Sequence, residues 1–161
     1  NFSDIKIYNI DGYSPGKSLN YGVTKCSNDY VLVLSAHSQI MNCECGKLKD
    51  LLDEYCVVGG KQIPIWNGKK ISRRYVWSNF IDKDGTNLFS NNENRYFLHN
   101  AFAFYTKQTL INNPFDETLS TKEDRYWVND MIDRGGKSYY NSNTICHHHY
   151  TDNGATWKGI G

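Results

Sequence analysis

The sequence lacks a long hydrophobic run, so these residues show no transmembrane helix. Such a helix needs about 20 consecutive apolar residues, and the longest compact run here is Val31-Leu32-Val33-Leu34. The opening residues, Asn1-Phe2-Ser3-Asp4, are polar and do not form the basic and then apolar pattern of a signal peptide. We therefore expect a cytoplasmic protein, in at most peripheral contact with the inner face of the membrane.

The chain also lacks an excess of either charge. Its 18 Lys and Arg residues balance 17 Asp and Glu residues, which gives a formal charge of +1. A protein built to hold a nucleic acid backbone carries a strong positive excess, so nucleic acid is excluded as the main partner. The 161 residues are 39% hydrophobic and 22% charged, a composition that suits one folded domain over residues 1–161.

The cysteines are odd in number, so they cannot all pair in disulfides within the chain. The five residues are Cys26, Cys43, Cys45, Cys56 and Cys146. Without a secretory signal, an odd count favours reduced thiols in the cytoplasm. Cys43-x-Cys45 has the spacing of half a zinc site, but no second closely spaced pair completes it.

The first 37 residues predict a strand, a helix, a second strand and a ligand-binding edge. Residues 5–8 favour a strand, and Ser14-Pro15 is typical of a helix start, with the helix ending near Lys25. The continuous run Tyr30–Leu34 is typical of a strand covered on both faces. This βαβ pattern predicts a parallel pair, and Ser35–His37 would follow at the carboxyl edge, where open α/β sheets bind ligands.

Beyond this unit the pattern is weaker, with a long polar stretch at 61–98 that predicts a loop. We expect a helix from about 46 to 55, a strand at 56–59, and a final strand pair at 137–140 and 144–147. Ser120-Thr121-Lys122-Glu123 matches a capping box, so Ser120 should cap a helix that ends at Gly135-Gly136.

Two acids in the first turn of that helix are candidates for chemistry. Helix capping explains Glu123 well, but it explains Asp124 less well. Asp124 precedes Trp127, Val128 and Met131 by three, four and seven residues, so it borders the apolar stripe of the helix. A carboxylate at that position should point toward the body of the protein.

Histidines form the second group of candidates. His147-His148-His149 would place His147 and His149 on one face of a strand, where two imidazoles can hold a divalent ion or a phosphate, although exposed surface histidines fit equally well. His37 ends the predicted central strand. The segment Ser14–Lys17 offers backbone N–H groups and one Lys near a helix start, a weak anion-binding signal.

Taken in order, these segments resemble the family-2 glycosyltransferases of the GT-A fold, over about residues 5–150. The most specific block is Glu123-Asp124-x-x-Trp127. The others are Tyr13-Ser14-Pro15-Gly16-Lys17-Ser18-Leu19-Asn20-Tyr21-Gly22, Asn28 through His37, Asn100-Ala101, Phe115-Asp116-Glu117, Tyr139-Tyr140 and Cys146-His147-His148-His149.

The resemblance implies a GT-A-like (Rossmann-like) α/β fold: a mixed, mostly parallel sheet flanked by helices. It implies an inverting sugar transfer from a nucleotide-sugar donor to a saccharide or lipid-linked saccharide, in surface polysaccharide biosynthesis. It also implies a divalent cation, manganese or magnesium, at the diphosphate. The family's first strand and helix would precede Ile5, so we expect a catalytic domain that is incomplete at its N-terminus.

The same resemblance implies roles for individual residues. Asp124 would be the general base, with Glu123 beside it. Ser35-Ala36-His37 stands in place of the family's Asp-x-Asp metal motif, so either His37 takes over the role of the last acid or metal binding is weak or lost. The implied donor-binding residues are Lys17, Asn20, Ser35, Ala36, His37 and Arg125; the acceptor-binding residues are Asn100, Ala101 and Trp127; the metal ligands are His37, His147 and His149.

Two other functions fit parts of the sequence. One is a non-catalytic module that binds a nucleotide or a sugar, which the absence of Asp-x-Asp favours. The other is a His/Asp metal hydrolase, but the nearest spacing, His149 to Asp152, fits no hydrolase motif.

Overall fold

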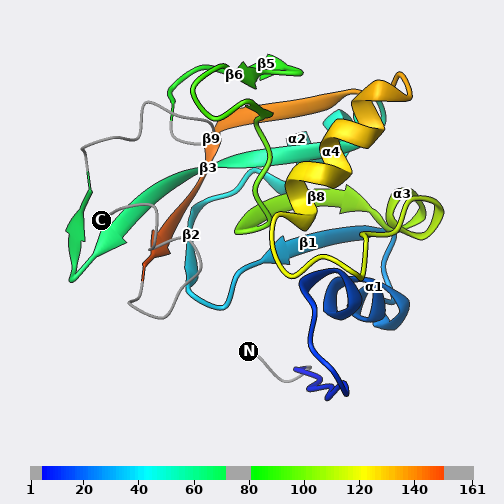
Figure 1. Ribbon diagram of the computed structural model, residues 1–161. Coiled ribbons are helices and arrows are strands. Elements are labelled where there is room, and N and C mark those ends of the chain that lie inside the picture. The colour runs from blue at the N-terminus through cyan, green and yellow to red at the C-terminus, as the bar shows by residue number, and fades with distance from the viewer. Residues whose placement is uncertain (1–4, 72–80, 151–161) are drawn as a thin grey trace.

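The computed structural model describes residues 5–71 and 81–150 (Figure 1). Its elements, in chain order, are α1 (Pro15–Lys25), β1 (Tyr30–Leu34), β2 (Ser38–Asn42), α2 (Cys45–Leu52), β3 (Val57–Trp66), β4 (Lys69–Lys70), β5 (Gly85–Thr86), β6 (Phe89–Ser90), β7 (Arg95–Tyr96), β8 (Phe102–Thr106), α3 (Lys107–Asn112), α4 (Glu123–Asp133) and β9 (Ser138–His149).

The main sheet is curled into a half-barrel, and its strands are mostly antiparallel. Its order is β1-β8-β3-β9-β2, with β4 beside β3 and β5 beside β9. Among the described strands, β3 and β9 are the one parallel pair of neighbours. The expectation of a GT-A-like, mostly parallel sheet flanked by helices is therefore wrong.

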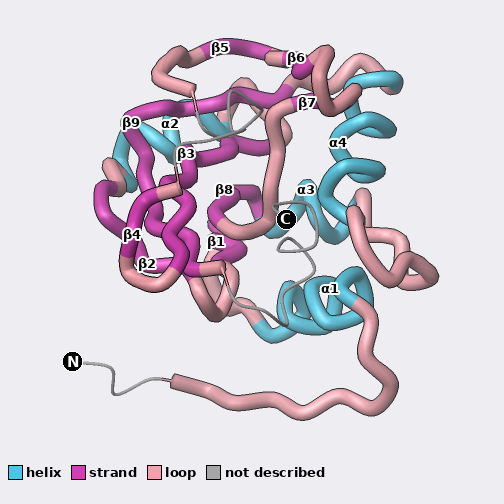
Figure 2. Tube along the Cα trace, turned by 60° about the vertical axis from the view of Figure 1, so that its left-hand side comes forward, coloured by secondary structure: helices cyan, strands magenta, loops and turns pink. Residues whose placement is uncertain are grey.

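The physical reason lies at the start of the chain. Residues 5–8, the expected parallel partner of Tyr30–Leu34, form no strand and lie exposed, and the segment before α1 runs along the outside of the molecule (Figure 2). β1 pairs instead with β8, antiparallel, and it ends the strand order rather than centring the sheet. Its side chains alternate between exposed and buried, so it is not covered on both faces.

A three-residue connection forces the sheet to curl. β1 and β2 lie at opposite ends of the strand order, yet only residues 35–37 separate them in sequence. Four peptide steps span at most about 14 Å, so the end of β1 and the start of β2 must lie near each other. The Ser38 N–H donates to the Ser35 carbonyl at 2.9 Å, and the Ser35 N–H donates to the Ala101 carbonyl at 3.3 Å.

β9 is one long strand rather than the expected final pair. Gly60 of β3 is paired with Asn141 and the next residue, Lys61, with Ile145, so β9 contains three extra residues at this point. The Asn141 side-chain oxygen accepts the N–H groups of Asn143 and Thr144, at 2.9 and 3.0 Å. This bulge bends the strand, which pairs with β5 before it and with β2 after it.

Helices pack on both faces of the sheet. Successive side chains of β8 point alternately into the two cores that form there. Ala103 and Tyr105 pack with buried residues of α1, α3 and α4. Phe102 and Phe104 pack with Leu48 and Leu52 of α2 on the opposite face. β8 thus holds the helices in place from the interior of the sheet.

Contacts with a distant loop fix α1. The side chain of Asn20 donates to the Phe115 carbonyl and accepts the Phe115 N–H, both at 2.9 Å. A Cβ on Gly16 would clash with the Asp116 carbonyl, so the helix approaches this loop closely. The loop leads into α4, and α1 therefore helps to place the start of α4.

Several local predictions are confirmed. α1 spans Pro15–Lys25, and the Ser14 side chain caps it by accepting the Lys17 N–H at 3.2 Å. Gly135, with φ of 87°, ends α4.

Other local predictions differ from the structure. The helix expected to end at 55 ends at Leu52, and β3 extends through Pro64 into the stretch expected to be a loop. No helix in the described ranges is long and apolar enough to cross a membrane.

We predict that Gly60→Ala destabilises the fold, whereas Gly22→Ala does not. A Cβ on Gly60 would lie 2.5 Å from a ring carbon of Phe102 and 3.0 Å from the Thr144 carbonyl, and such overpacking typically costs about 1–3 kcal/mol. Gly22 lies in α1 with open space around it, where Ala is favoured by up to about 1 kcal/mol.

Thermal and urea unfolding of the two variants checks this prediction. The melting temperature should fall for Gly60→Ala and stay level or rise for Gly22→Ala. Equal changes in both variants would contradict a tight packing role for Gly60.

Candidate functional site

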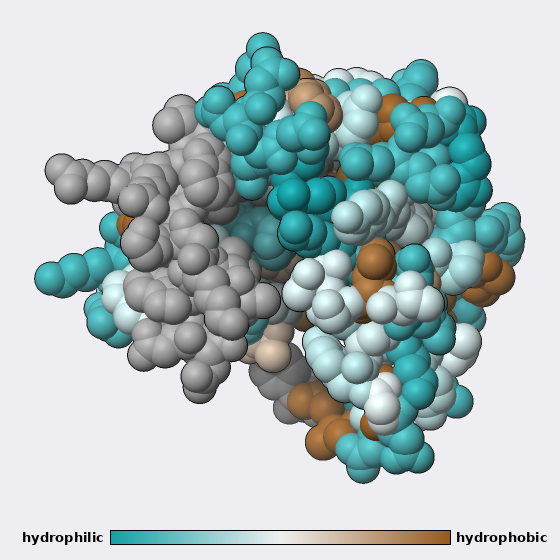
Figure 3. All heavy atoms as spheres, in the orientation of Figure 1, coloured by the Kyte–Doolittle hydropathy of each residue, from teal (hydrophilic) through white to brown (hydrophobic). Residues whose placement is uncertain are grey.

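A cleft of about 660 Å³ opens between the starts of α1 and α4. The lining is completed by the end of β1 and the loop after it, by Arg95 and residues 99–101 before β8, by residues 120–125, and by His148 of β9. Hydrophilic side chains cover much of the described surface on the side shown in Figure 3. The cleft itself is lined by both polar and apolar residues, from segments that are far apart in sequence.

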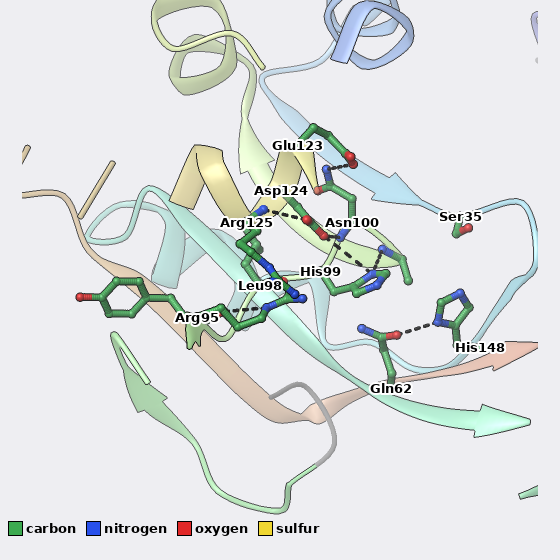
Figure 4. A network of polar contacts seen from close by, with 12 residues as sticks. Ser35, Gln62, Arg95, Leu98, His99, Asn100, Glu123, Asp124, Arg125 and His148 are labelled. Atoms are coloured by element: carbon green, nitrogen blue, oxygen red, sulfur yellow. Dashed lines mark hydrogen bonds and ion pairs between the residues drawn. The ribbon is translucent and has the colours of Figure 1, made fainter. Parts of the chain in front are cut away.

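Asp124 lines this cleft, and both of its carboxylate oxygens accept hydrogen bonds (Figure 4). Its Oδ2 accepts the Asn100 N–H at 3.1 Å, and its Oδ1 accepts the Arg125 N–H at 2.7 Å. The side chain is only 6% exposed. Two backbone N–H groups, one of them at the start of α4, therefore fix the orientation of this carboxylate.

The start of α4 differs from the predicted capping box. The helix begins at Glu123, and its N-cap is Lys122 in the left-handed conformation, with φ of 64°, so Ser120 is not the cap. Asp124 accepts one of the free helix N–H groups itself. Glu123 is directed elsewhere, since its Oε1 accepts the Asn100 side-chain amide at 3.2 Å. Burial, and next the charge of Asp124, raise the pKa of Glu123.

Asn100 connects the two acids to the core. Its N–H binds Asp124, its side-chain nitrogen binds Glu123, and its side-chain oxygen accepts the Tyr105 hydroxyl at 2.7 Å. Tyr105 is fully buried, and this burial raises its pKa well above the usual value, so the hydroxyl keeps its proton and donates. Asn100, predicted to bind an acceptor, is thus engaged in holding both carboxylates.

One imidazole, His99, adjoins Asp124, and two more, His148 and His37, continue from it as a chain of ring contacts. His99 Nδ1 accepts the Ala101 N–H at 3.0 Å and lies 3.9 Å from Asp124 Oδ2. The His148 ring lies edge-on to His99 at 5.5 Å and stacks on His37 at 4.6 Å. His148 is 1% exposed, and its Nδ1 lies 2.7 Å from Gln62 Oε1. Burial lowers the pKa of His148 to about 2, so its ring is neutral.

The structure brings about half of the predicted site residues into the cleft. Those that line it are Ser35, His37, Asn100, Ala101, Glu123, Asp124 and Arg125. Those that do not line the cleft formed by the described residues are Lys17, Asn20, Ala36, Trp127, His147 and His149.

The residues outside the cleft have other partners. Lys17 Nζ donates to the Asp11 carbonyl, and Asn20 holds the loop before α4. Trp127, 5% exposed, donates its ring N–H to the Asn113 carbonyl at 2.7 Å and belongs to the core. A short sequence motif near a site therefore contains residues that build the scaffold as well as residues that line the cleft.

The predicted metal ligands lie on two sides of β9. His147 and His149 share one face, with ring centroids 6.3 Å apart, while His148 between them faces the interior. The His149 N–H donates to the His37 carbonyl at 2.9 Å, but the ring stacked on His37 belongs to His148. Within the described ranges, no three His, Cys, Asp or Glu side chains are arranged to hold a metal ion. A divalent cation stays a prediction.

The cysteine pair, Cys43 and Cys45, likewise forms no metal site with other described residues. The sulfur atoms of Cys43 and Cys45 lie 3.5 Å apart, at the start of α2, and both are free thiols. Neither belongs to a set of three or more metal-binding side chains in the part of the chain that the structure describes.

Sequence reasoning missed Arg95 and His99, which both line the cleft. Arg95 is 6% exposed, its Nη2 donates to the Leu98 carbonyl, and its Nε donates to the Tyr96 carbonyl at 3.4 Å. Nothing in its local sequence indicated burial, because it lies in a polar stretch without periodicity. The one available signal for His99 was its place directly before Asn100.

No protein-family model matches this sequence, and a search of curated proteins found no match. A functional interpretation therefore depends on the geometry of the cleft and on the motifs of the chain itself.

We predict that Tyr105→Phe lowers the free energy of unfolding by about 1–3 kcal/mol, because it leaves the buried Asn100 oxygen without its donor. Tyr126→Phe is the matched control, since Tyr126 is 54% exposed on α4. Urea unfolding measures both changes. A loss of stability as large in Tyr126→Phe as in Tyr105→Phe would show that the Asn100 bond is not the cause.

A second prediction concerns pH. The pKa of Glu123 is raised above its usual 4.5 in the folded chain, so between the two values the folded state holds a proton that the unfolded state has released. The contribution of this group to stability therefore falls as pH rises through that window. Glu123→Gln cannot titrate and should remove this fall, as measured by urea unfolding between about pH 4 and pH 7. An unchanged pH dependence would contradict the raised pKa.

Proposed function

We propose that this chain transfers a sugar from a nucleotide-sugar donor to a hydroxyl group of a saccharide or lipid-linked saccharide, with inversion at the anomeric carbon. The observation that carries the proposal is Asp124, a buried carboxylate that lines the cleft with both oxygens held by backbone N–H groups. The Glu-Asp-x-x-Trp block supports the same reaction. The proposal does not depend on the mostly parallel sheet, which is absent.

The first chemical task is to remove a proton from the acceptor hydroxyl, which is a poor nucleophile at neutral pH. Asp124 takes this proton as the hydroxyl oxygen bonds to the anomeric carbon. The bond from that carbon to the phosphate oxygen breaks on the opposite side, and the nucleoside diphosphate leaves with the electron pair. Attack and departure on opposite sides invert the anomeric carbon.

The second task is to stabilise the negative charge that develops on the leaving diphosphate. Arg95 and Arg125 line the cleft and supply fixed positive charge. Arg125 Nε is buried and has no hydrogen-bond partner among the described residues, so the guanidinium keeps an unused donor beside the cleft. A divalent cation with His37 as one ligand would add charge at the same place.

Glu123 and Asn100 act on Asp124 rather than on the substrate. Asn100 donates to both carboxylates and is held in turn by Tyr105, so the two acids keep separate positions. With its raised pKa, Glu123 holds a proton more readily than an ordinary glutamate, which limits the negative charge next to the base.

A non-catalytic sugar- or nucleotide-binding module remains the second candidate. Ser35-Ala36-His37 in place of two acids favours it. Binding of a nucleotide sugar with neither transfer nor hydrolysis would support this module over an enzyme. Under the leading proposal, the chain acts in surface polysaccharide synthesis and makes contact with a membrane surface.

We predict that Asp124→Asn lowers kcat for sugar transfer by about 10²–10⁴-fold and leaves donor affinity nearly unchanged, because the amide keeps the shape and loses the basicity. Asp130→Asn, at an exposed position of the same helix, is the matched control and should keep wild-type turnover. Glu123→Gln should lower kcat much less. The assay follows release of nucleoside diphosphate from UDP- and GDP-sugars.

Wild-type turnover in Asp124→Asn would contradict the role of this residue as the base. A comparable loss in Asp130→Asn would show that changes anywhere on α4 impair the chain, and that the effect is not specific to the cleft.

A further inference from the structure

His99 lies beside the proposed base, and its hydrogen bonds determine which ring nitrogen carries the proton. Its Nδ1 accepts the backbone N–H of Ala101 at 3.0 Å, so Nδ1 must present a lone pair there. A neutral imidazole with a bare Nδ1 carries its proton on Nε2. Burial lowers the pKa of His99, and this effect favours the neutral ring.

The Nε2–H of His99 is available to a ligand. His99 lines the cleft, and no described residue accepts a hydrogen bond from its Nε2. The edge-on contact with His148 and the bond to Ala101 hold the ring in one orientation (Figure 4). The cleft thus contains a fixed, neutral donor next to the fixed, charged acceptor Asp124.

The two groups lie close enough to bind neighbouring atoms of one ligand. Asp124 Oδ2 and His99 Nδ1 are 3.9 Å apart, and Nε2 is further along the same ring. A carboxylate binds a group that can give up a proton, whereas a neutral N–H binds an oxygen lone pair. Adjacent hydroxyl groups on a sugar ring offer both kinds of atom at short separation.

We propose that His99 and Asp124 together recognise a vicinal diol of the acceptor sugar, in which Asp124 binds the reacting hydroxyl and His99 Nε2–H donates to the hydroxyl next to it. The inference rests on the proposed function, and it names the feature of the acceptor that the cleft selects. His99 is then a substrate-binding residue that sets acceptor specificity, and the proton transfer itself belongs to Asp124.

The arrangement favours a neutral hydroxyl over an anionic group at this position. An anion beside Asp124 would meet a negative charge, and a neutral His99 offers one hydrogen bond without a compensating positive charge. Arg95 and Arg125 also line the cleft, and their positive charges suit the diphosphate instead. The cleft therefore has separate groups for the acceptor hydroxyls and for the charged part of the donor.

The test begins with the tautomer. Long-range ¹H–¹⁵N NMR of the wild-type chain should show His99 protonated on Nε2 alone. A spectrum with the proton on Nδ1 would overturn the inference, whatever the activity of the chain.

Two matched substitutions then separate the two ring positions. The amide of His99→Gln reaches the place of Nε2, whereas the shorter amide of His99→Asn reaches only the place of Nδ1. The probes are the methyl glycosides of glucose, galactose, mannose and N-acetylglucosamine, with binding measured by ligand-observed NMR. For the tightest of these, we expect affinity to fall about 3- to 10-fold in His99→Asn and His99→Ala, and to be largely retained in His99→Gln.

Single-deoxy analogues of the same glycoside identify the hydroxyl. Removal of the hydroxyl that His99 binds should weaken binding to the wild type by a similar factor and have no further effect in His99→Ala. In turnover assays, KM for the acceptor should rise in His99→Asn while kcat changes little, which separates binding from a loss of folded protein.

The outcomes distinguish the inference from the function on which it rests. Equal glycoside affinity in the wild type, His99→Asn and His99→Ala would overturn the inference and leave sugar transfer standing. Turnover of nucleotide sugars without binding of any methyl glycoside would also overturn the inference alone. A wild-type chain with neither turnover nor glycoside binding would overturn the proposed function, and the inference with it.

Discussion

The short connection between β1 and β2 is the constraint on which the arrangement of the molecule depends. Residues 35–37 join strands from opposite ends of the sheet order, so the sheet cannot lie flat. The curl brings this connection over β9, where His37 stacks on His148, and beside the segment that leads into β8. The cleft exists because the two ends of one sheet are held together at this point.

The two acids in the cleft are held in place by a network of hydrogen bonds. A low-dielectric surrounding makes an unpaired carboxylate costly, and Asp124 and Glu123 are therefore bound to the same asparagine. That asparagine is held by a buried tyrosine hydroxyl on the strand that separates the two cores. The position of the proposed base is thus determined by residues that themselves belong to the scaffold.

Local elements could be predicted from the sequence wherever short-range chemistry decides them. Ser14-Pro15 marked the start of α1, and Asp124 was identified as a buried acid because its place beside the apolar stripe is a property of one helix. The sheet could not be predicted in the same way. Its pairing depends on partners such as β1 with β8, about 70 residues apart, and no periodicity in Tyr30–Leu34 specifies them. His99 and Arg95 were missed for the same reason, since only the fold brings them to Asp124.

The position of β9 has a consequence for how the chain acquires its structure during synthesis. β9 lies inside the sheet, between β3 and β2, so β2 has no partner among the described strands until residues 138–149 have left the ribosome. Strands that are as far apart in sequence as β2 and β9 pair slowly. Before that moment the exposed apolar faces of the earlier elements are open to wrong partners, and chaperones are the usual protection. Premature termination before Ser138 would therefore release a chain without the strand that joins β2 to the rest of the sheet, rather than a shortened version of the same fold.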